Sequence, residues 1–247
     1  MNEPISKEEY EKIITSAPFD MELPVYIGKS GEKPLYVDLI NAKSIAMYGA
    51  CGISAVCDTS LFSMLKAREQ VLREKYFICI CCTNGYYSWG FKDIPFADEY
   101  ITDPCTAIYD LLHYYNLVKR TLVELSEMTE DERIASGYIY SYEEYKEYLA
   151  KHPRLYIFEG YCGPLSEGIL KNSDLDLDAV KDTFENADKF HIYIFIPDCI
   201  RGKNELAESI HTSVNIVWTE KCYSASITQD GEIMKDNICM DWCSENR

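Results

Sequence analysis

The chain has 247 residues, which suits one large domain or two small ones, and it carries 24 Lys and Arg against 41 Asp and Glu, for a formal net charge of -17 at pH 7. It contains no apolar run of the roughly 20 residues that span a bilayer, so we expect a soluble chain, which is compatible with its being one piece of a larger protein. Nucleic-acid binding needs clustered basic residues that release counterions, so this charge argues against a nucleic-acid partner.

Hydrophobic periodicity and capping residues predict helices that alternate with strands. Residues 6–16 begin with Ser6 and carry Glu9 three positions later, which is typical of a capped helix. We expect residues 17–31 to be irregular because Pro18 and Pro24 interrupt them. The expected elements that follow are strands 34–39 and 44–48, helix 53–75, strand 76–82, helices 105–127 and 141–151, strand 154–158, helix 176–188, strand 191–197, helix 203–211, strand 214–218 and a closing strand within 233–242.

Strands that alternate with helices and lack a polar face are typical of a parallel sheet covered on both sides. We therefore predict an α/β fold with a mainly parallel sheet flanked by helices. The 11 cysteines, several of them in apolar runs, are expected to be free thiols in a reducing, cytoplasmic compartment. Cys222, Cys239 and Cys243 lack a nearby histidine, so we predict no metal site.

In such sheets, ligands bind beyond the carboxyl ends of the strands, which draws attention to the turn after strand 44–48. This turn consists of Gly49, Ala50, Cys51, Gly52, Ile53, Ser54, Ala55 and Val56. In the phosphate-loop pattern G-x-x-x-x-G-K-[ST], Ser54 takes the place of the second glycine, Ala55 that of the lysine and Val56 that of the hydroxyl residue. The order of strand, loop and helix fits a phosphate loop, but the ammonium for the β/γ-phosphates and the hydroxyl for magnesium are missing.

Several motifs around this turn resemble FtsK/SpoIIIE-type motor domains, in particular those of the type VII secretion ATPases EssC and EccC. PLYVDL at 34–39 and SIAMYGACG at 44–52 resemble the first two strands and the loop of that family. DEYITD at 98–103, YEEYKEY at 142–148 with PRLYIFE at 153–159, FHIYIFI at 190–196 and the stretch 205–218 resemble later family segments in the same order. The resemblance implies a P-loop NTPase, RecA-like domain over residues 26–247, preceded by an N-terminal helix and linker at 1–25.

The same comparison implies degenerate nucleotide motifs. Glu159 takes the position of the family's second acidic motif, but Gly160 follows it where the family has an acid or Asn. The loop from Gly49 to Val56 is then a vestigial nucleotide-binding loop, and Glu159 a degenerate acid. We expect no cofactor, although bound ATP and magnesium stay an open alternative.

The resemblance also implies a role for the chain. It predicts a catalytically inactive, cytoplasmic ATPase-like domain of a membrane-anchored type VII secretion motor, acting in substrate recognition or in regulation of the active ATPase domains. The implied partners are secreted helical-hairpin protein substrates, neighbouring ATPase domains of the same chain, and further copies in a homo-oligomer of the full motor.

Two other functions stay open. The first is a working or nucleotide-binding ATPase that uses a non-standard lysine, with Lys43 and Lys66 as candidates. The second is a DNA-translocase-like module, against which the net charge weighs. The glycines of the turn are also compatible with a simple tight connection, and Glu159 with a solvated loop carboxylate.

Tyrosine is unusually frequent, with 20 residues, and several lie close together between Tyr138 and Tyr148. Aromatic side chains on exposed faces are enriched in protein-binding surfaces, because they bury a large area at a small entropic cost. The alternative is that these rings cover the sheet. The sequence leaves both interpretations open.

Overall fold

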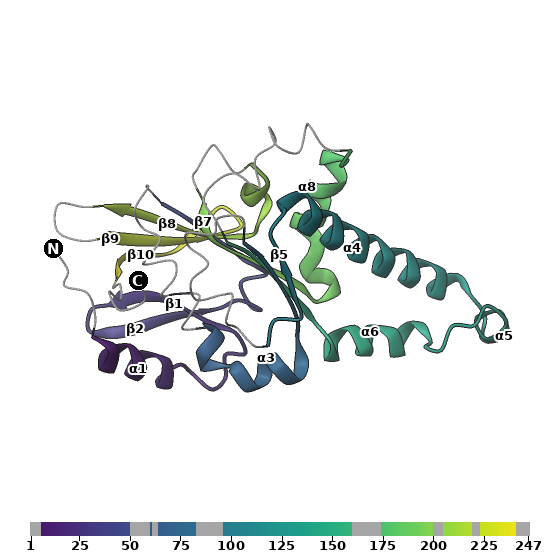
Figure 1. The fold of residues 1–247 in the computed structure, drawn as a ribbon, viewed down its shortest axis with the longest axis horizontal. Helices are drawn as coiled ribbons and strands as arrows, with labels where there is room; N and C mark the ends of the chain where they lie inside the picture. Colours follow the sequence, from purple (N-terminus) through teal and green to yellow (C-terminus); the bar gives the residue numbers. More distant parts are fainter. Residues whose placement is uncertain are drawn as a thin grey trace.

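The computed structural model describes residues 6–49, 60, 64–82, 96–159, 174–199, 205–218 and 223–240 (Figure 1). Helices and strands alternate along much of this part of the chain. In chain order they are α1 (Lys7–Thr15), β1 (Pro24–Ser30), β2 (Lys33–Asp38), β3 (Ile45–Tyr48), α3 (Glu69–Lys75), β4 (Phe77–Cys82), β5 (Glu99–Ile101), α4 (Pro104–Glu127), α5 (Glu130–Ala135), α6 (Tyr142–Lys151), β6 (Arg154–Glu159), α8 (Leu177–Asn186), η1 (Ala187–Phe190), β7 (Ile192–Cys199), η2 (Glu205–Ser209), β8 (Thr212–Trp218), β9 (Tyr223–Gln229) and β10 (Glu232–Met240).

Within the described residues, ten strands form one sheet in the order β2-β1-β10-β9-β8-β3-β7-β6-β4-β5. The strands from β8 to β5 in this order run parallel to one another. The remaining four, β9, β10, β1 and β2, extend the sheet beyond β8 with antiparallel pairing. This topology confirms the predicted α/β fold with a mainly parallel sheet.

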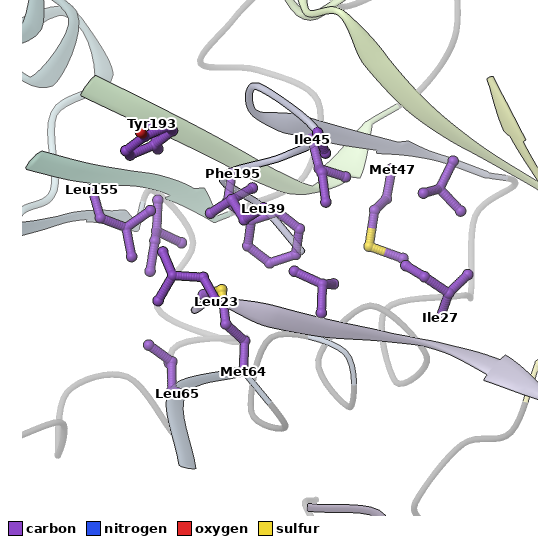
Figure 2. Packing of buried hydrophobic residues seen from close by; sticks show 14 of the residues in the cluster. Leu23, Ile27, Leu39, Ile45, Met47, Met64, Leu65, Leu155, Tyr193 and Phe195 are labelled. Carbon is purple, nitrogen blue, oxygen red and sulfur yellow. The ribbon is translucent and has the colours of Figure 1, made fainter. Parts of the chain in front are cut away.

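Helices cover both faces of the sheet, as the apolar strands predict. Consecutive residues of β3 point into different cores, with Ile45 and Met47 in one cluster and Ala46 and Tyr48 in the other. Alternation of this kind follows from the two-residue period of a strand. Figure 2 shows the first cluster, in which Phe195 of the central strand β7 is fully buried.

Each cluster is closed by a different set of helices. Leu72 of α3 belongs to the first cluster. Leu111 of α4, Phe184 of α8 and Leu206 of η2 belong to the second. The chain therefore passes to opposite faces of the sheet after different strands, a property that matters for the candidate site.

The predicted helix boundaries are confirmed where capping residues set them. Ser6 accepts a hydrogen bond from the backbone N of Glu9 at the start of α1. At α6, Ser141 and Glu144 form a capping box in which each side chain accepts a hydrogen bond from the other residue's backbone N–H. Such reciprocal bonds satisfy donors that the first turn of a helix leaves open.

Some expected elements differ from the structure. The stretch 17–31 was expected to be irregular, but β1 begins at Pro24, where the missing N–H costs nothing at the first position of a strand. The expected boundary between residues 25 and 26 falls inside this strand. The expected helix 203–211 is the short 3-10 helix η2 in its described part, and the expected helix 53–75 is described as helical only at residue 60, at 64–67 and in α3.

A helical hairpin projects from the parallel side of the sheet. Figure 1 shows α4 and α6 leaving the sheet at separate places and converging on α5, which forms the far end of the projection. The 24-residue helix α4 starts at Asp103, whose carboxylate accepts a hydrogen bond from the backbone N of Thr106 at 2.7 Å. We refer to α4, α5 and α6 together as the arm.

Candidate functional site

The carboxyl end of β3 lies where the connections leave the sheet in opposite directions. β3 is the neighbour of β8 on one side and of β7 on the other. The chain after β3 reaches α3 on the first face, whereas after β6 and β7 it reaches α8 and η2 on the second face. Parallel sheets bind ligands at such a switch point, so the geometry supports the location chosen from the sequence.

A turn at the opposite end of β3 fixes this strand between its neighbours. The Oγ of Ser44 accepts a hydrogen bond from the backbone N of Ile194 in β7 at 2.8 Å. On the other side, the Oγ1 of Thr212 in β8 donates to the carbonyl oxygen of Ala42 at 2.7 Å. Both bonds are buried, so they hold β3 in register where its own ladder begins. Nothing in the sequence distinguishes Ser44 from an ordinary turn residue, so this function could not be predicted.

The backbone of the same turn adopts an unusual conformation. Lys43 has φ of 52° and Ser44 has φ of 83°, a left-handed region that favours glycine. The carboxylate of Asp38, at the end of β2, accepts a hydrogen bond from the backbone N of Leu23 at 3.0 Å and another from Nδ2 of Asn41 at 3.1 Å. These bonds hold the turn in a conformation that its residue types would not otherwise prefer.

The predicted site residues lie only partly within the described chain. Gly49 directly follows β3 and is partly buried. The other residues of the loop lie outside the described residues: Ala50, Cys51, Gly52, Ile53, Ser54, Ala55 and Val56. Their assignment as a vestigial nucleotide loop therefore stays a prediction.

Glu159 is the last residue of β6, at the same edge of the sheet as Gly49, and its main chain pairs with Cys82 of β4. Ile157 of β6 and Ile45 of β3 both pair with Phe195, so Glu159 lies at the level of Met47 with β7 in between. Two strand spacings separate these main chains by about 10 Å. The backbone thus brings Gly49 and Glu159 to one edge of the sheet.

The structure describes both lysines considered as substitutes for the loop lysine. Lys43 precedes β3 and is separated from Gly49 by the whole strand, which spans about 13 Å. Lys66 is exposed, and its Nζ lies 3.7 Å from a carboxylate oxygen of Glu69. Lys43 is therefore not placed to offer a cation to phosphates bound after β3.

A polar network lies at the opposite, amino-terminal edge of the sheet. Glu22 accepts hydrogen bonds from Nζ of Lys75 and from the hydroxyl of Tyr76, both at 2.5 Å. Burial raises the pKa of Glu22, but these two hydrogen bonds outweigh it, and the pKa lies below its ordinary value. Burial, followed by the charge of Lys75, lowers the pKa of the nearby His191. The network links the residues just before β1 and β7 to the end of α3, at the edge of the sheet opposite to Gly49.

An open hollow of about 480 Å³ borders β3, β8, β9 and η2, and its lining includes Tyr48 and Ser213. His211 forms part of its wall, with Nδ1 2.5 Å from Oδ1 of Asp230 and Nε2 2.9 Å from the carbonyl oxygen of Glu185. Both ring nitrogens are thus occupied by contacts that join β8, α8 and the turn after β9. Among the described residues, no three His, Cys, Asp or Glu are grouped so that they could hold a metal ion.

No helix in the described ranges is long and apolar enough to cross a membrane. No protein-family model matches the chain, and no curated protein is similar to it at a significant level. Solved structures, in contrast, match it over almost its whole length.

The conjugation coupling protein TcpA of pCW3, solved as a monomer with ATPγS, has a TM-score of 0.54 at 10% identity, over 98% of this chain and 70% of that one. The cytoplasmic domain of EssC also has a TM-score of 0.54 at 10% identity, over 99% of this chain and 47% of that one. ATPases 2 and 3 of Thermomonospora curvata EccC, in complex with a signal sequence peptide, have a TM-score of 0.51 at 9% identity, over 89% of this chain and 40% of that one.

These matches show that the chain has the fold of such ATPase domains. They confirm the predicted α/β, RecA-like architecture, and they confirm the resemblance to EssC and EccC at the level of the fold. The chain spans less than half the length of the EssC and EccC structures that it matches.

Proposed function

We propose that this chain is an ATPase-like domain of a membrane-anchored type VII secretion motor, and that it recognises proteins without hydrolysing ATP. Its partners in this role are secreted helical-hairpin substrates and the active ATPase domains of the motor. The observation that carries the proposal is the pairing of an intact ATPase topology with a loop that lacks the chemistry of phosphate transfer.

The missing groups are those on which phosphoryl transfer depends. Ala55 and Val56 take the places of the lysine and the hydroxyl residue, directly after the strand at the switch point. A positioned lysine and a magnesium ion stabilise the charge on the transferring phosphoryl group, so a loop without both is not expected to support turnover. Glu159 stands at the acidic position, but Gly160 supplies no second polar side chain.

The acidic charge supports a protein partner over nucleic acid. A net charge of -17 repels a phosphate backbone and offers little counterion release. ATPases 2 and 3 of EccC, which match this fold, were solved in complex with a signal sequence peptide, and this supports a peptide ligand for the chain. The same class of ligand is therefore the first to test on this chain.

A turnover assay tests the catalytic half of the proposal. We expect the purified chain with ATP and magnesium to release phosphate no faster than buffer alone. A rate above the buffer that falls in Glu159→Gln would contradict the proposal and favour a working ATPase. In that case, Lys43→Ala and Lys66→Ala would identify which lysine replaces the one missing from the loop.

A binding assay tests the recognition half. Fluorescently labelled C-terminal peptides of secreted helical-hairpin proteins from the same organism are titrated with the chain, and their scrambled sequences serve as controls. We expect at least one cognate peptide to bind with a Kd of about 10 μM or lower. The absence of binding by every cognate peptide, with a chain that is folded by circular dichroism, would refute this half.

A further inference from the structure

The arm exposes much of its surface although its end is rigidly built. No residue of α5 is buried, and Ile139, between α5 and α6, is 83% exposed. Whereas α4 contributes to the core, the end of the arm buries little apolar surface and so gains little stability in return for its ordering. We call residues 129–141, from the start of α5 to the start of α6, the arm tip. The arm tip is therefore a candidate for a contact with another molecule.

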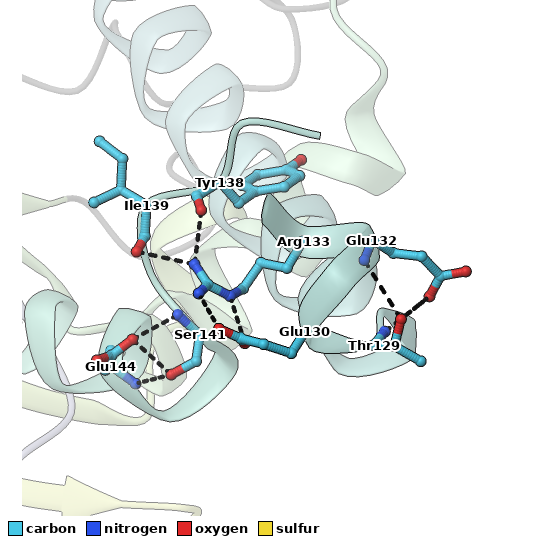
Figure 3. Close-up of polar contacts among 8 residues, drawn as sticks. All are labelled: Thr129, Glu130, Glu132, Arg133, Tyr138, Ile139, Ser141 and Glu144. Atoms are coloured by element: carbon cyan, nitrogen blue, oxygen red, sulfur yellow. Dashed lines mark hydrogen bonds and ion pairs between the residues drawn. The ribbon is translucent and has the colours of Figure 1, made fainter. Parts of the chain in front are cut away.

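Hydrogen bonds fix the arm tip in one conformation (Figure 3). The guanidinium of Arg133 holds the carboxylate of Glu130 through two bonds, of 2.6 Å and 3.0 Å. It also donates to the carbonyl oxygens of Tyr138 at 2.7 Å and Ile139 at 3.0 Å. Capping boxes at Thr129 and Ser141 fix the first turns of α5 and α6. A surface that is ordered before binding loses less entropy when a partner arrives.

A stack of aromatic rings runs from the arm tip along α6. The ring centroids of Tyr140 and Tyr148 lie 5.2 Å apart, and those of Tyr148 and His152 lie 4.6 Å apart. Tyr145 lies beside the stack, 6.3 Å from Tyr140 and 6.2 Å from Tyr148. Tyr140 and Tyr148 are each 38% exposed, so part of their surface faces solvent. We call these four residues the ring stack.

Carboxylates flank the ring stack. Glu144 of α6 is exposed and lies four residues before Tyr148, a spacing that places two side chains close together on a helix, and Glu143 and Glu147 are exposed on the same helix. Backbone and side-chain hydrogen bonds from Ser141 lower the pKa of Glu144, and those from Arg133 lower the pKa of Glu130, so both carboxylates keep their charge. The surface therefore combines aromatic faces with negative charge.

At the base of the arm, a guanidinium group packs against aromatic rings beside a carboxylate. The guanidinium carbon of Arg154 lies 3.5 Å from the ring centroid of Tyr114 and 4.2 Å from that of Phe77, with a carboxylate oxygen of Asp110 3.8 Å from its NH1. In the part of the chain that the structure describes, no cation lies over the rings of Tyr140, Tyr145 or Tyr148. Aromatic faces beside carboxylates attract arginine and lysine.

We propose that the ring stack and its carboxylates bind a cationic segment of another protein, with arginine or lysine side chains placed over Tyr140 and Tyr148. The charge of the chain and the chemistry of the surface both complement such a segment. This inference rests on the proposed role in protein recognition and assigns a surface and a partner chemistry to it. It does not depend on the nucleotide loop.

The test uses the whole chain and a defined probe. The probe is a fluorescein-labelled amphipathic helical peptide with arginine and leucine on one face, measured by fluorescence anisotropy at physiological salt. A second peptide has glutamate in place of every arginine. The test variant is Tyr140→Leu with Tyr148→Leu, which keeps apolar bulk and removes the ring faces. The matched control is Tyr109→Leu, because Tyr109 is an exposed tyrosine of α4 whose ring stacks on His113.

We expect the arginine peptide to bind the wild-type chain and the glutamate peptide not to bind. The double variant is expected to bind about tenfold more weakly than wild type, and the Tyr109 control within about twofold of it. Equal urea midpoints for all chains show that each is folded. The inference is overturned if the arginine peptide does not bind, or if the double variant loses no more affinity than the control. Neither result depends on ATP turnover, so a failure here is distinguishable from a failure of the proposed function.

Discussion

Replacement of Ser44 tests whether the turn before β3 positions the strand that leads to the candidate site. Ser44 is 2% exposed, and its Oγ is the acceptor for the backbone N of Ile194 in β7. Ser44→Ala removes this acceptor and keeps the Cβ. Ser44→Gly removes the same acceptor but also relieves the backbone, because φ of 83° at this position suits glycine.

The structure sets the size of both effects. An unpaired buried N–H at Ile194 costs about 1–3 kcal/mol, which is the expected destabilisation of Ser44→Ala. A non-glycine residue in the left-handed region is unfavourable by about 1–2 kcal/mol, a cost that alanine keeps and glycine avoids. We therefore expect Ser44→Gly to be less destabilised than Ser44→Ala by about 1 kcal/mol, after the extra entropy of glycine in the unfolded chain is subtracted.

Equilibrium unfolding in urea, followed by circular dichroism, measures these differences. A loss of about 2 kcal/mol lowers the urea midpoint by roughly 0.5–1 M for a chain of this size. The reasoning is refuted if Ser44→Ala lies within about 0.5 kcal/mol of wild type, or if Ser44→Gly is the less stable of the two. Equal slopes of the unfolding curves are required for the comparison.

Two other predictions concern the amino-terminal edge of the sheet. Burial and the charge of Lys75 lower the pKa of His191, so the unfolded chain binds the proton more readily than the folded one. The stability of the fold therefore decreases as the pH falls below about 6.5, the ordinary histidine pKa. Asparagine tolerates the positive φ of 57° at position 191, so His191→Asn should keep the fold. Its urea midpoint should change less with pH than that of wild type between pH 7 and the lowered pKa of His191. An unchanged pH dependence would count against His191 as the group responsible. Arg154→Met keeps the stem of the side chain but loses the contacts with Tyr114, Phe77 and Asp110, so we expect a loss of about 1–3 kcal/mol in urea unfolding. Arg154→Lys should recover only part of this loss, because lysine cannot stack as a plane, and full recovery would argue that charge alone matters.

Local sequence signals account well for the parallel half of the sheet. The apolar runs that became β3, β4, β6 and β7 are buried on both faces, so composition alone marks them as strands. Ser6 and the Ser141–Glu144 pair mark helix starts because their function is local. The carboxyl end of β3 could be chosen as the site for the same reason, since strand, glycine turn and helix follow one another directly.

The antiparallel extension was harder to predict because its strands are stabilised by distant partners. In β9, Ser224 and Ser226 alternate with the buried Ala225 and Ile227, and the strand is held by β8 and β10 on its two sides. β1 begins with a proline and pairs with β2 and β10, the latter more than 200 residues away in the sequence. Such pairing is decided by the tertiary structure and leaves a weak trace in local composition.

The arm tip was missed for a related reason. The six-residue helix α5 buries no residue, so it shows no hydrophobic periodicity. Thr129 followed by Glu132 was the available signal, because this pair forms a capping box in the structure. The sequence could show that tyrosines gather between Tyr138 and Tyr148, but only the structure shows which rings stack and which remain exposed.

The central claim is that the loop after β3 lacks working nucleotide chemistry, from which we predict that it does not bind nucleotide phosphates, and a thermal shift of the purified chain tests this most directly. A ligand that binds only the folded state raises the melting temperature, so ATP at about 5 mM with magnesium would reveal even weak binding. TcpA, which was solved with ATPγS, serves as the positive control under the same conditions. We predict an unchanged melting temperature for this chain; a clear increase that is lost without magnesium would contradict the claim and restore a nucleotide-dependent function.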